Sequence, residues 1–279
     1  MFTLDCDRAY LYAHPERELT ADEVSRYDAA LARRATGVPA QYITGHQEFW
    51  GMDLIVSPAV LIPRPETEHV VEAVLELGSG NGVRQGQSQN QGQDQNQDQQ
   101  PRTGVSAPHE LRIVDVGTGS GAIALALAQE FPGAEIHASD ICPEALEVAR
   151  ANAARRELTQ RITFHHVDLI SGLPHGWFDF VVSNPPYVGE SEEDSVQLEV
   201  RKFEPRRAVF AGATGLEVIE RLIPQAHDAL RPGGWLIVEI SGTIEVGVCG
   251  LLSRWSEVEI RNDLQGIARV AVARKLPRS

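Results

Sequence analysis

Apolar positions along this chain change their spacing several times, and each change predicts a different element. Between residues 21 and 35, Val24, Tyr27 and Leu31 recur at helical spacing, with charged residues on the other face. Thr20 precedes the segment and is a residue type that caps helix N-termini. The pattern predicts an amphipathic helix over residues 21–35.

A different pattern occupies the next stretch. QYITGHQEFWGMDLIVSPAVLI, residues 41–62, contains β-branched and aromatic residues interrupted by glycine and proline. Such a segment is typical of short strands or a hairpin. Helical spacing returns in TEHVVEAVLEL, residues 67–77, and predicts a second helix.

Residues 78–108 contain almost no apolar side chain and alternate glutamine with small or polar residues. A segment of this composition does not bury enough surface to offset the entropy lost on ordering. We expect a disordered linker or surface insertion between a small front module and a larger back module. A functional glutamine-rich tract is the alternative.

Strand-like and helix-like runs alternate through the back module, residues 109–279. Strands are predicted at residues 111–117, 134–140, 161–168, 178–183, 234–241, 256–262 and 268–275, and helices at 120–130, 143–156, 216–230 and between 241 and 256. This alternation predicts an α/β fold, a mostly parallel sheet with helices on both faces. The last two strands are too close in sequence for a crossover helix and predict an antiparallel edge.

Composition and charge exclude several classes of protein. Hydrophobic residues make up 42% of the chain, an ordinary share for a soluble globular protein. The formal net charge of -14 and the pI near 5.1 argue against a protein that must neutralise the phosphates of duplex DNA. Two arginine pairs, at 33–34 and 206–207, are interpreted as solvated surface rather than as a binding patch.

Cysteine usage and the absence of long apolar runs bear on location. Cys6, Cys142 and Cys249 are widely separated, and this spacing predicts neither a disulfide framework nor a zinc site. The first residues carry charges where a signal peptide needs an apolar core, and no apolar run approaches the length of a bilayer span. We expect a cytoplasmic protein with no metal and no membrane partner.

A glycine-rich segment, VDVGTGSGA at residues 114–122, ends a predicted strand and opens a predicted helix. Glycines let the backbone turn sharply there and approach a ligand with exposed N–H groups. Asp140 follows at the end of the next strand, where a carboxylate can accept both hydroxyls of a ribose. These features suit a nicotinamide dinucleotide and S-adenosylmethionine equally.

The tetrapeptide NPPY follows a third apolar strand and is more specific. Asn184 can accept a hydrogen bond through its side-chain oxygen, and the carbonyl of Pro185, held extended by the following proline, can accept another. Two neighbouring acceptors match an NH2 group. Tyr187 offers an aromatic face on which a flat amide or base can stack.

These motifs resemble those of a known family. NPPY after such a glycine-rich loop is similar to methyltransferases that modify amide or exocyclic amino nitrogens. LIPRPETE, DVGTGSGA and SNPPY occur in the order typical of the release factor glutamine methyltransferases known as HemK or PrmC, and KFEPRRAVFAG and DLQGIARV follow at matching places. The resemblance runs from about Leu19 to the C-terminus, interrupted only by residues 78–108.

The resemblance implies both an activity and an architecture. The activity is transfer of a methyl group from S-adenosyl-L-methionine to the side-chain amide nitrogen of a glutamine in peptide chain release factors, in their GGQ motif. The fold is a class I S-adenosylmethionine-dependent methyltransferase, a Rossmann-like seven-stranded sheet with an antiparallel edge. We expect a helical substrate-binding domain at 1–40, a hairpin and connecting helix at 41–77, the insertion at 78–108 and the methyltransferase domain at 109–279. The helical domain is expected to be incomplete, or the start codon to be misassigned, because the chain begins inside the region where that bundle is usually under way.

Site residues are carried over motif by motif. The resemblance implies that Asp140 binds the ribose, that Asp168 and Leu169 line the adenine, and that Arg64 and Glu66 border the active site or fix the following helix. The remaining assignments place the cofactor loop at Gly117, Thr118, Gly119, Ser120 and Gly121, the acceptor glutamine at Asn184, Pro185, Pro186 and Tyr187, the catalytic function at Asn184, Pro185 and Tyr187, and an edge contact to the cofactor at Asn184.

Three other functions are weighed against this one. Methylation of a ribosomal-protein glutamine shares NPPY and much of the front module. DNA adenine methylation is disfavoured because the chain is acidic and leaves no room for a base-reading domain. A non-catalytic binding domain requires NPPY to be idle. The sequence names no general base, since His165 and His166 are interpreted as ordinary strand residues.

Overall fold

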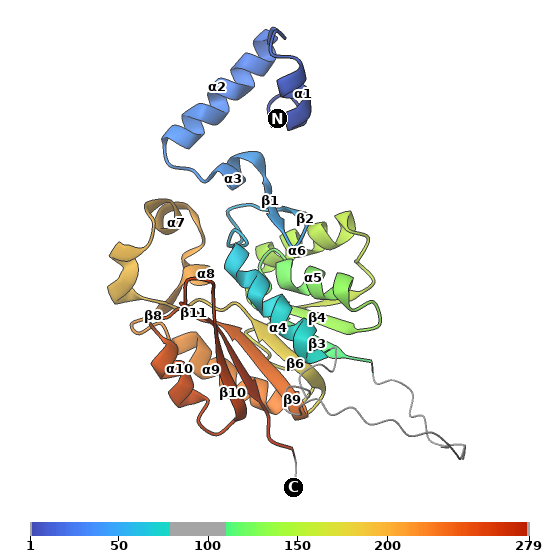
Figure 1. The fold of residues 1–279 in the computed structure, drawn as a ribbon, viewed down its shortest axis with the longest axis vertical. Helices are drawn as coiled ribbons and strands as arrows, with labels where there is room; N and C mark the ends of the chain where they lie inside the picture. The colour runs from blue at the N-terminus through green and yellow to red at the C-terminus, as the bar shows by residue number, and fades with distance from the viewer. Residues whose placement is uncertain (1, 79–109, 278–279) are drawn as a thin grey trace, which may run out of the picture.

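The computed structural model describes residues 2–78 and 110–277. Its front part has three helices, a hairpin and a helix that reaches the main sheet (Figure 1). The bounds are α1 (Arg8–Ala13), α2 (Ala21–Ala35), α3 (Ala40–Thr44), β1 (His46–Phe49), β2 (Met52–Ile55), the 3-10 turn η1 (Pro65–Thr67) and α4 (Glu68–Gly78). The predicted glutamine-rich insertion lies outside the described residues, apart from its first residue.

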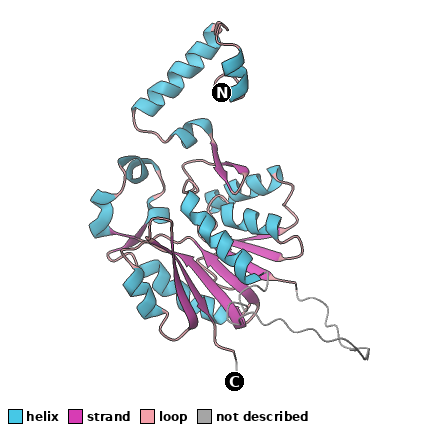
Figure 2. Cartoon of the chain, viewed as in Figure 1, coloured by secondary structure: helices cyan, strands magenta, loops and turns pink. Residues whose placement is uncertain are grey.

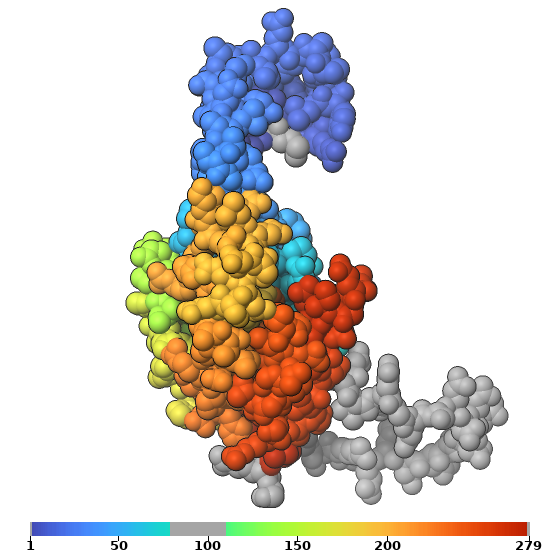
Figure 3. Space-filling view, turned by 90° about the vertical axis from the view of Figure 1, so that its left-hand side faces the viewer, coloured from blue at the N-terminus to red at the C-terminus, as the bar shows by residue number. Residues whose placement is uncertain are grey.

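Helix α2 confirms the predicted amphipathic helix. Thr20 and Glu23 form a reciprocal capping box at its N-terminus. The apolar stripe, however, faces solvent: Val24, Tyr27 and Leu31 are 42%, 48% and 48% exposed. Figure 3 shows why, since the helices α1 and α2 stand away from the main body on a narrow connection.

The segment after α2 forms the predicted hairpin and one additional helix. Strands β1 and β2 pair antiparallel with His46 opposite Ile55. The short helix α3 precedes them and ends at Gly45, whose φ of +80° is a left-handed conformation that glycine adopts without strain. Strand-like residues over 41–44 had predicted no helix there, because five residues are too few for helical spacing to show.

The back part is a seven-stranded sheet with helices on both faces (Figure 2). The strand order is β10-β11-β9-β6-β3-β4-β5, with β11 and β10 antiparallel at one edge, as predicted. The strands are β3 (Arg112–Val116), β4 (Glu135–Asp140), β5 (Ile162–His166), β6 (Phe178–Ser183), β9 (Leu230–Glu239), β10 (Ser256–Asn262) and β11 (Ala268–Arg274). The main helices are α5 (Ala122–Glu130), α6 (Pro143–Arg155), α9 (Glu217–Ala229) and α10 (Glu245–Leu251).

Short elements join β6 to α9. They are β7 (Val188–Gly189), η3 (Glu190–Ser195), α7 (Leu198–Phe203), α8 (Arg206–Val209) and β8 (Phe210–Gly212). These segments reach back toward the front domain, and Arg34 at the end of α2 forms an ion pair with Glu199 on α7 at 3.1 Å. The α7–α8 region therefore lies between the helical front domain and the sheet.

Neighbouring residues on each strand belong to two separate cores. Ile113 packs with α4, α5 and the β1–β2 hairpin, whereas the adjacent Val114 packs with α9 and α10. Strands buried on both faces read as continuous apolar runs. The chain leaves β3 for β4 and β5, then returns to β6 on the other side of β3, so the strand order reverses beside β3. Ligands bind outside the carboxyl ends of strands at such a reversal.

Asn152 on α6 connects the hairpin to the glycine loop. Its Oδ1 accepts the Ile55 N–H at 2.7 Å, and its Nδ2 donates to the Ile55 carbonyl at 3.0 Å and the Ser120 carbonyl at 2.9 Å. The side chain is fully buried, so loss of these bonds would leave three backbone groups unsatisfied.

We expect Asn152→Ala to lower the free energy of unfolding by about 2–5 kcal/mol, because each buried group left without a partner costs about 1–3 kcal/mol. Guanidinium unfolding measures the loss, with Asn262→Ala on the exposed edge strand β10 as the matched control. A change below about 0.5 kcal/mol, which is typical of surface substitutions, would contradict the structural role of Asn152.

Among the described residues, no helix is both long and apolar enough to cross a membrane.

Candidate active site

The predicted site residues converge at the carboxyl ends of β3, β4, β5 and β6. The glycine loop follows β3, Asp140 ends β4, Asp168 follows β5 and Asn184 follows β6. Adjacent parallel strands bring these four positions together although they are far apart in the sequence.

The glycine loop adopts conformations that favour glycine. Gly117, Gly119 and Gly121 have φ values of +72°, +56° and +84°. A Cβ added at Gly117 or Gly119 would meet no described atom within 4 Å, so open space lies beside both. Side chains at these two positions would strain the backbone and fill the space where a ligand can approach.

The hydroxyl of Thr118 forms a hydrogen bond with a buried side chain of the protein. It donates to Asp115 Oδ2 at 2.6 Å, and the same oxygen accepts the Ala124 N–H at 3.2 Å. Asp115 is fully buried, and its Oδ1 has no hydrogen-bond partner among the described residues. Thr118 and Asp115 thus hold the loop against the start of α5.

Burial raises the pKa of the Asp115 carboxyl to about 7, more than the hydrogen bonds from Thr118 and Ala124 lower it. Because the pKa of Asp115 is higher in the folded than in the unfolded protein, its protonated carboxyl favours folding. This contribution to stability is complete below about pH 4 and is lost as pH rises through about 7. Asp115→Asn removes this ionisation. We expect the stability of the variant relative to wild type to rise by several kcal/mol from pH 4 to pH 8, at about 1.4 kcal/mol per pKa unit.

Unfolding in denaturant at both pH values measures this difference. Because the comparison is between two proteins at each pH, other groups that titrate in the same window cancel. A stability difference independent of pH would show that Asp115 is already ionised throughout.

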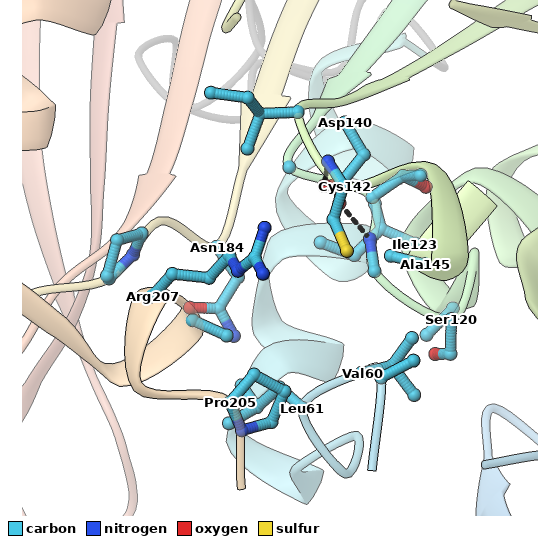
Figure 4. Close-up of a pocket in the computed structure, with 18 of the residues that line it drawn as sticks. Val60, Leu61, Ser120, Ile123, Asp140, Cys142, Ala145, Asn184, Pro205 and Arg207 are labelled. Atoms are coloured by element: carbon cyan, nitrogen blue, oxygen red, sulfur yellow. Dashed lines mark hydrogen bonds between the residues drawn. The ribbon is translucent and has the colours of Figure 1, made fainter. Parts of the chain in front are cut away.

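Asp140 fixes the glycine loop and lines the cavity beside it. Its Oδ2 accepts the Gly119 N–H at 2.9 Å and its Oδ1 accepts the Cys142 N–H at 2.8 Å. Burial raises the pKa of Asp140, opposed by these hydrogen bonds and by the charge of Arg207. Arg207 and Asn184 both line this cavity and are labelled in Figure 4.

Asp168 and Leu169 complete the far side of the cavity. Asp168 forms an ion pair with Arg221 on α9. Leu169 has a φ of +55°, which is uncommon for a residue with a side chain and is a type of strain found at ligand sites.

The cavity formed by these groups, here called the cofactor cavity, has a volume of about 220 Å³. Glycine backbone, a carboxylate and apolar side chains meet in it, which fits a nucleoside: the carboxylate suits ribose hydroxyls, and Ile141 and Leu169 provide apolar walls. Its other lining residues include Pro63, Thr67, Ser120, Ile123, Pro186 and Pro205.

A second cavity of about 360 Å³, here called the acceptor cavity, lies on the other side of Asn184. Pro185, Pro186 and Tyr187 line it, as do Arg64 and Glu66. Further lining residues are Leu61, Val188, Gln197, Val200, Ala208, Glu239 and Arg269. NPPY therefore lies where the two cavities meet.

Asn184 is oriented by Thr67, a residue that sequence reasoning missed. Asn184 Nδ2 donates to Thr67 Oγ1 at 2.9 Å. With its NH2 group bonded to Thr67, Asn184 keeps the lone pairs of its Oδ1 for an incoming donor. Thr67 belongs to LIPRPETE, so this motif acts directly on the NPPY motif.

Tyr187 is held at both ends of its side chain. Its ring packs against the α9–α10 core, and its hydroxyl donates to Glu239 Oε1 at 3.1 Å. The predicted stacking of an acceptor on this ring remains a prediction.

Both roles considered for Arg64 are compatible with its position. It lines the acceptor cavity and forms an ion pair with the buried Glu204, which also accepts the Ile62 N–H at 3.1 Å. Glu204 lies in KFEPRRAVFAG, a motif that the sequence had singled out without a role.

The structure adds residues to the predicted site. Arg207, interpreted from sequence as solvated surface, lines the cofactor cavity; its neighbour Arg206 pairs with Glu193 at 2.6 Å. Glu239 and Arg269 line the acceptor cavity; no motif pointed to Glu239, whereas Arg269 lies in DLQGIARV, which the sequence had singled out without a role. Among the described residues, no group of three or more His, Cys, Asp and Glu side chains could hold a metal ion.

Comparisons with known proteins agree with this geometry. Residues 1–45 match the family described as the PrmC N-terminal domain, and residues 103–202 match the methyltransferase small domain. The chain is 52% identical to a release factor glutamine methyltransferase of Koribacter versatilis, over 99% of this chain and 88% of that protein. It is 36% identical to one of Geobacter sulfurreducens, over 97% of this chain and 85% of that protein.

A solved structure shows the same fold. The 16S rRNA methyltransferase RsmC of T. thermophilus, in complex with AdoMet and guanosine, is 18% identical with a TM-score of 0.53, over 82% of this chain and 49% of that chain. The predicted class I S-adenosylmethionine-dependent methyltransferase fold is thereby confirmed.

Proposed function

Because the chain belongs to the release factor glutamine methyltransferase family, we infer that it transfers a methyl group from S-adenosyl-L-methionine to the side-chain amide nitrogen of a glutamine in peptide chain release factors. The observation that carries this inference is the Asn184–Thr67 hydrogen bond at the junction of the two cavities. This hydrogen bond leaves Asn184 Oδ1 beside the cofactor cavity, where it can accept a hydrogen bond from an NH2 group. By family resemblance, the acceptor is the glutamine of the GGQ motif.

We propose that the cofactor is held by the glycine loop, Asp140, Asp168 and Leu169, around the cofactor cavity. When bound, S-adenosylmethionine supplies an electrophilic methyl group. Asp140 suits the ribose hydroxyls, and its hold on Gly119 keeps the loop open toward the ligand.

An amide nitrogen is a poor nucleophile because its lone pair is delocalised into the carbonyl. We propose that Asn184 Oδ1 and the Pro185 carbonyl accept the two N–H groups of the acceptor amide, here called the acceptor clamp. These acceptors orient the nitrogen and stabilise the positive charge that develops on it. Pro186 and Tyr187 line the same cavity and bound the acceptor side chain.

The exposed stripe on α2 supports a docking role for the front domain. Val24, Tyr27 and Leu31 lie on one helix face and are all exposed, and Tyr10 and Tyr12 on α1 are exposed as well. Exposed apolar groups that cluster on one surface mark interaction sites. We propose that this surface contacts the release factor, and that the enzyme works in the cytoplasm, where translation factors act.

Labelled S-adenosylmethionine tests the function against its alternatives. We expect a purified release factor to be labelled, and its variant with the GGQ glutamine replaced by alanine to stay unlabelled. Ribosomal protein and duplex DNA are offered in parallel. Preferential labelling of either, or no labelling of any acceptor by folded protein that binds the cofactor, would refute the proposal.

A further inference from the structure

Glu239 is a buried carboxyl group that the proposed reaction leaves without a role. It ends β9, next to β6 in the sheet, and lines the acceptor cavity with only 2% of its surface exposed. Its Oε1 accepts the Tyr187 hydroxyl, and its Oε2 has no hydrogen-bond partner among the described residues. A buried polar atom without a partner is costly, which calls for an explanation.

Thr67 connects Glu239 to Asn184. The Thr67 hydroxyl has one proton, and its oxygen accepts the Asn184 Nδ2–H at 2.9 Å. The hydroxyl proton is therefore available to another acceptor, and Glu239 Oε2 is a buried acceptor without a donor. Thr67 is near enough to Glu239 to lower the pKa of this carboxyl. The order of groups is Asn184, Thr67, Glu239 and then Tyr187.

The direction of every hydrogen bond in this series depends on Glu239. An ionised carboxylate only accepts, so the hydroxyls of both Thr67 and Tyr187 must point toward it. Thr67 then has only lone pairs to offer Asn184, which must turn its NH2 group to Thr67 and its Oδ1 to the cavity. A group at position 239 that can donate permits the reverse order, in which Thr67 donates to Oδ1 and Asn184 presents NH2 to the acceptor.

We propose that Glu239 is a positioning residue that sets the hydrogen-bond direction of the acceptor clamp, through Thr67 to Asn184 and directly to Tyr187. This inference rests on the proposed function, because it concerns how the same site presents an acceptor oxygen to a glutamine amide. Glu239 does not need to touch the substrate for this role.

Protonation of Glu239 provides an independent readout. Burial raises the pKa of this carboxyl to about 7, opposed by hydrogen bonds from Thr67 and Tyr187; Glu66 raises it further and Arg269 lowers it. Arg64 is the other charged group that lines this cavity, and Arg269 is itself paired with Asp263 at 2.8 Å. Below about pH 7 the protonated carboxyl carries its own donor, so turnover should fall as pH falls through this range.

The test compares Glu239→Gln, Thr67→Val and Thr67→Ser in the full chain, with a release factor as acceptor. We expect Glu239→Gln and Thr67→Val each to lower kcat by about tenfold to a hundredfold, the effect of a small misplacement, and their double variant to lower it no further. Thr67→Ser keeps the hydroxyl and should retain most of the activity. Affinity for S-adenosylmethionine by calorimetry should remain within about twofold in Glu239→Gln, because Glu239 does not line the cofactor cavity. Thr67 does line it, so the cofactor affinities of Thr67→Val and Thr67→Ser are compared with each other.

Glu259→Gln, on the exposed strand β10, is the matched control for the substitution itself, and melting temperatures verify folding. If Glu239→Gln does not fold, Thr67→Val against Thr67→Ser carries the test alone. Equal kcat for these two, or a wild-type pH profile that Glu239→Gln leaves unchanged, would overturn the role of Glu239. Failure of the wild-type enzyme to label a release factor would instead overturn the proposed function, so the two failures are distinguishable.

Discussion

Asn184→Ala should lower the turnover of release factor methylation by a hundredfold or more, because removal of one preorganised partner for developing charge costs about 10²–10³ in kcat. The structure strengthens this expectation, since the Thr67 hydrogen bond holds the side chain in one orientation. Affinity for S-adenosylmethionine should change little, because the proposed assignment gives Asn184 at most an edge contact with the cofactor. Single-turnover methylation and calorimetry measure the two quantities separately.

The matched control is Asn262→Ala, which removes the same side chain from the exposed edge strand β10. Near wild-type turnover in Asn184→Ala would refute the acceptor clamp. Complete loss of cofactor binding would make Asn184 chiefly a cofactor contact, and Pro185 and Tyr187 would then have to orient the acceptor.

Asp140→Ala should weaken S-adenosylmethionine binding by about tenfold to 150-fold, since hydrogen bonds to a charged group contribute about 1.5–3 kcal/mol and 1.4 kcal/mol is a factor of ten. Two effects add here. The variant loses the carboxylate assigned to the ribose, and it also loses the acceptor that holds the Gly119 N–H at 2.9 Å. Isothermal titration calorimetry measures the affinity.

Asp28→Ala on the exposed face of α2 controls for removal of a carboxylate, and circular dichroism verifies that both variants fold. Unchanged cofactor affinity in Asp140→Ala would mean that the ribose is held elsewhere and that the cofactor assignment is wrong.

The order of strands and helices could be predicted because their spacing patterns are local. Helix α2 follows from the helical period of its apolar residues, and the hairpin from its β-branched and aromatic residues. The parallel sheet follows from the alternation of strands and helices, and its antiparallel edge from the short connection between the last two strands. The helix α3 escaped prediction because one turn and a half contains too few residues for a period.

The interactions that orient the site could not be predicted in the same way. Thr67 and Asn184 are 117 positions apart, and Tyr187 and Glu239 are 52 positions apart. Neither pair belongs to one motif, and only the fold brings them into contact. Arg207 is exposed, as predicted, but it also lines the cofactor cavity, whereas its sequence neighbour Arg206 pairs with Glu193. Composition does not distinguish the two arginines.

The wall shared by the two cavities has a thermodynamic consequence. Leu61, Asn184, Pro186 and Ala208 line both, so a ligand that reorders this wall from one side changes the free energy of binding on the other. Linkage makes the effect reciprocal: the factor by which bound cofactor changes the affinity for release factor equals the factor by which bound release factor changes the affinity for cofactor. A cofactor that contacts this wall differently before and after it gives up its methyl group would, by the same linkage, change the affinity for the protein substrate as the reaction completes.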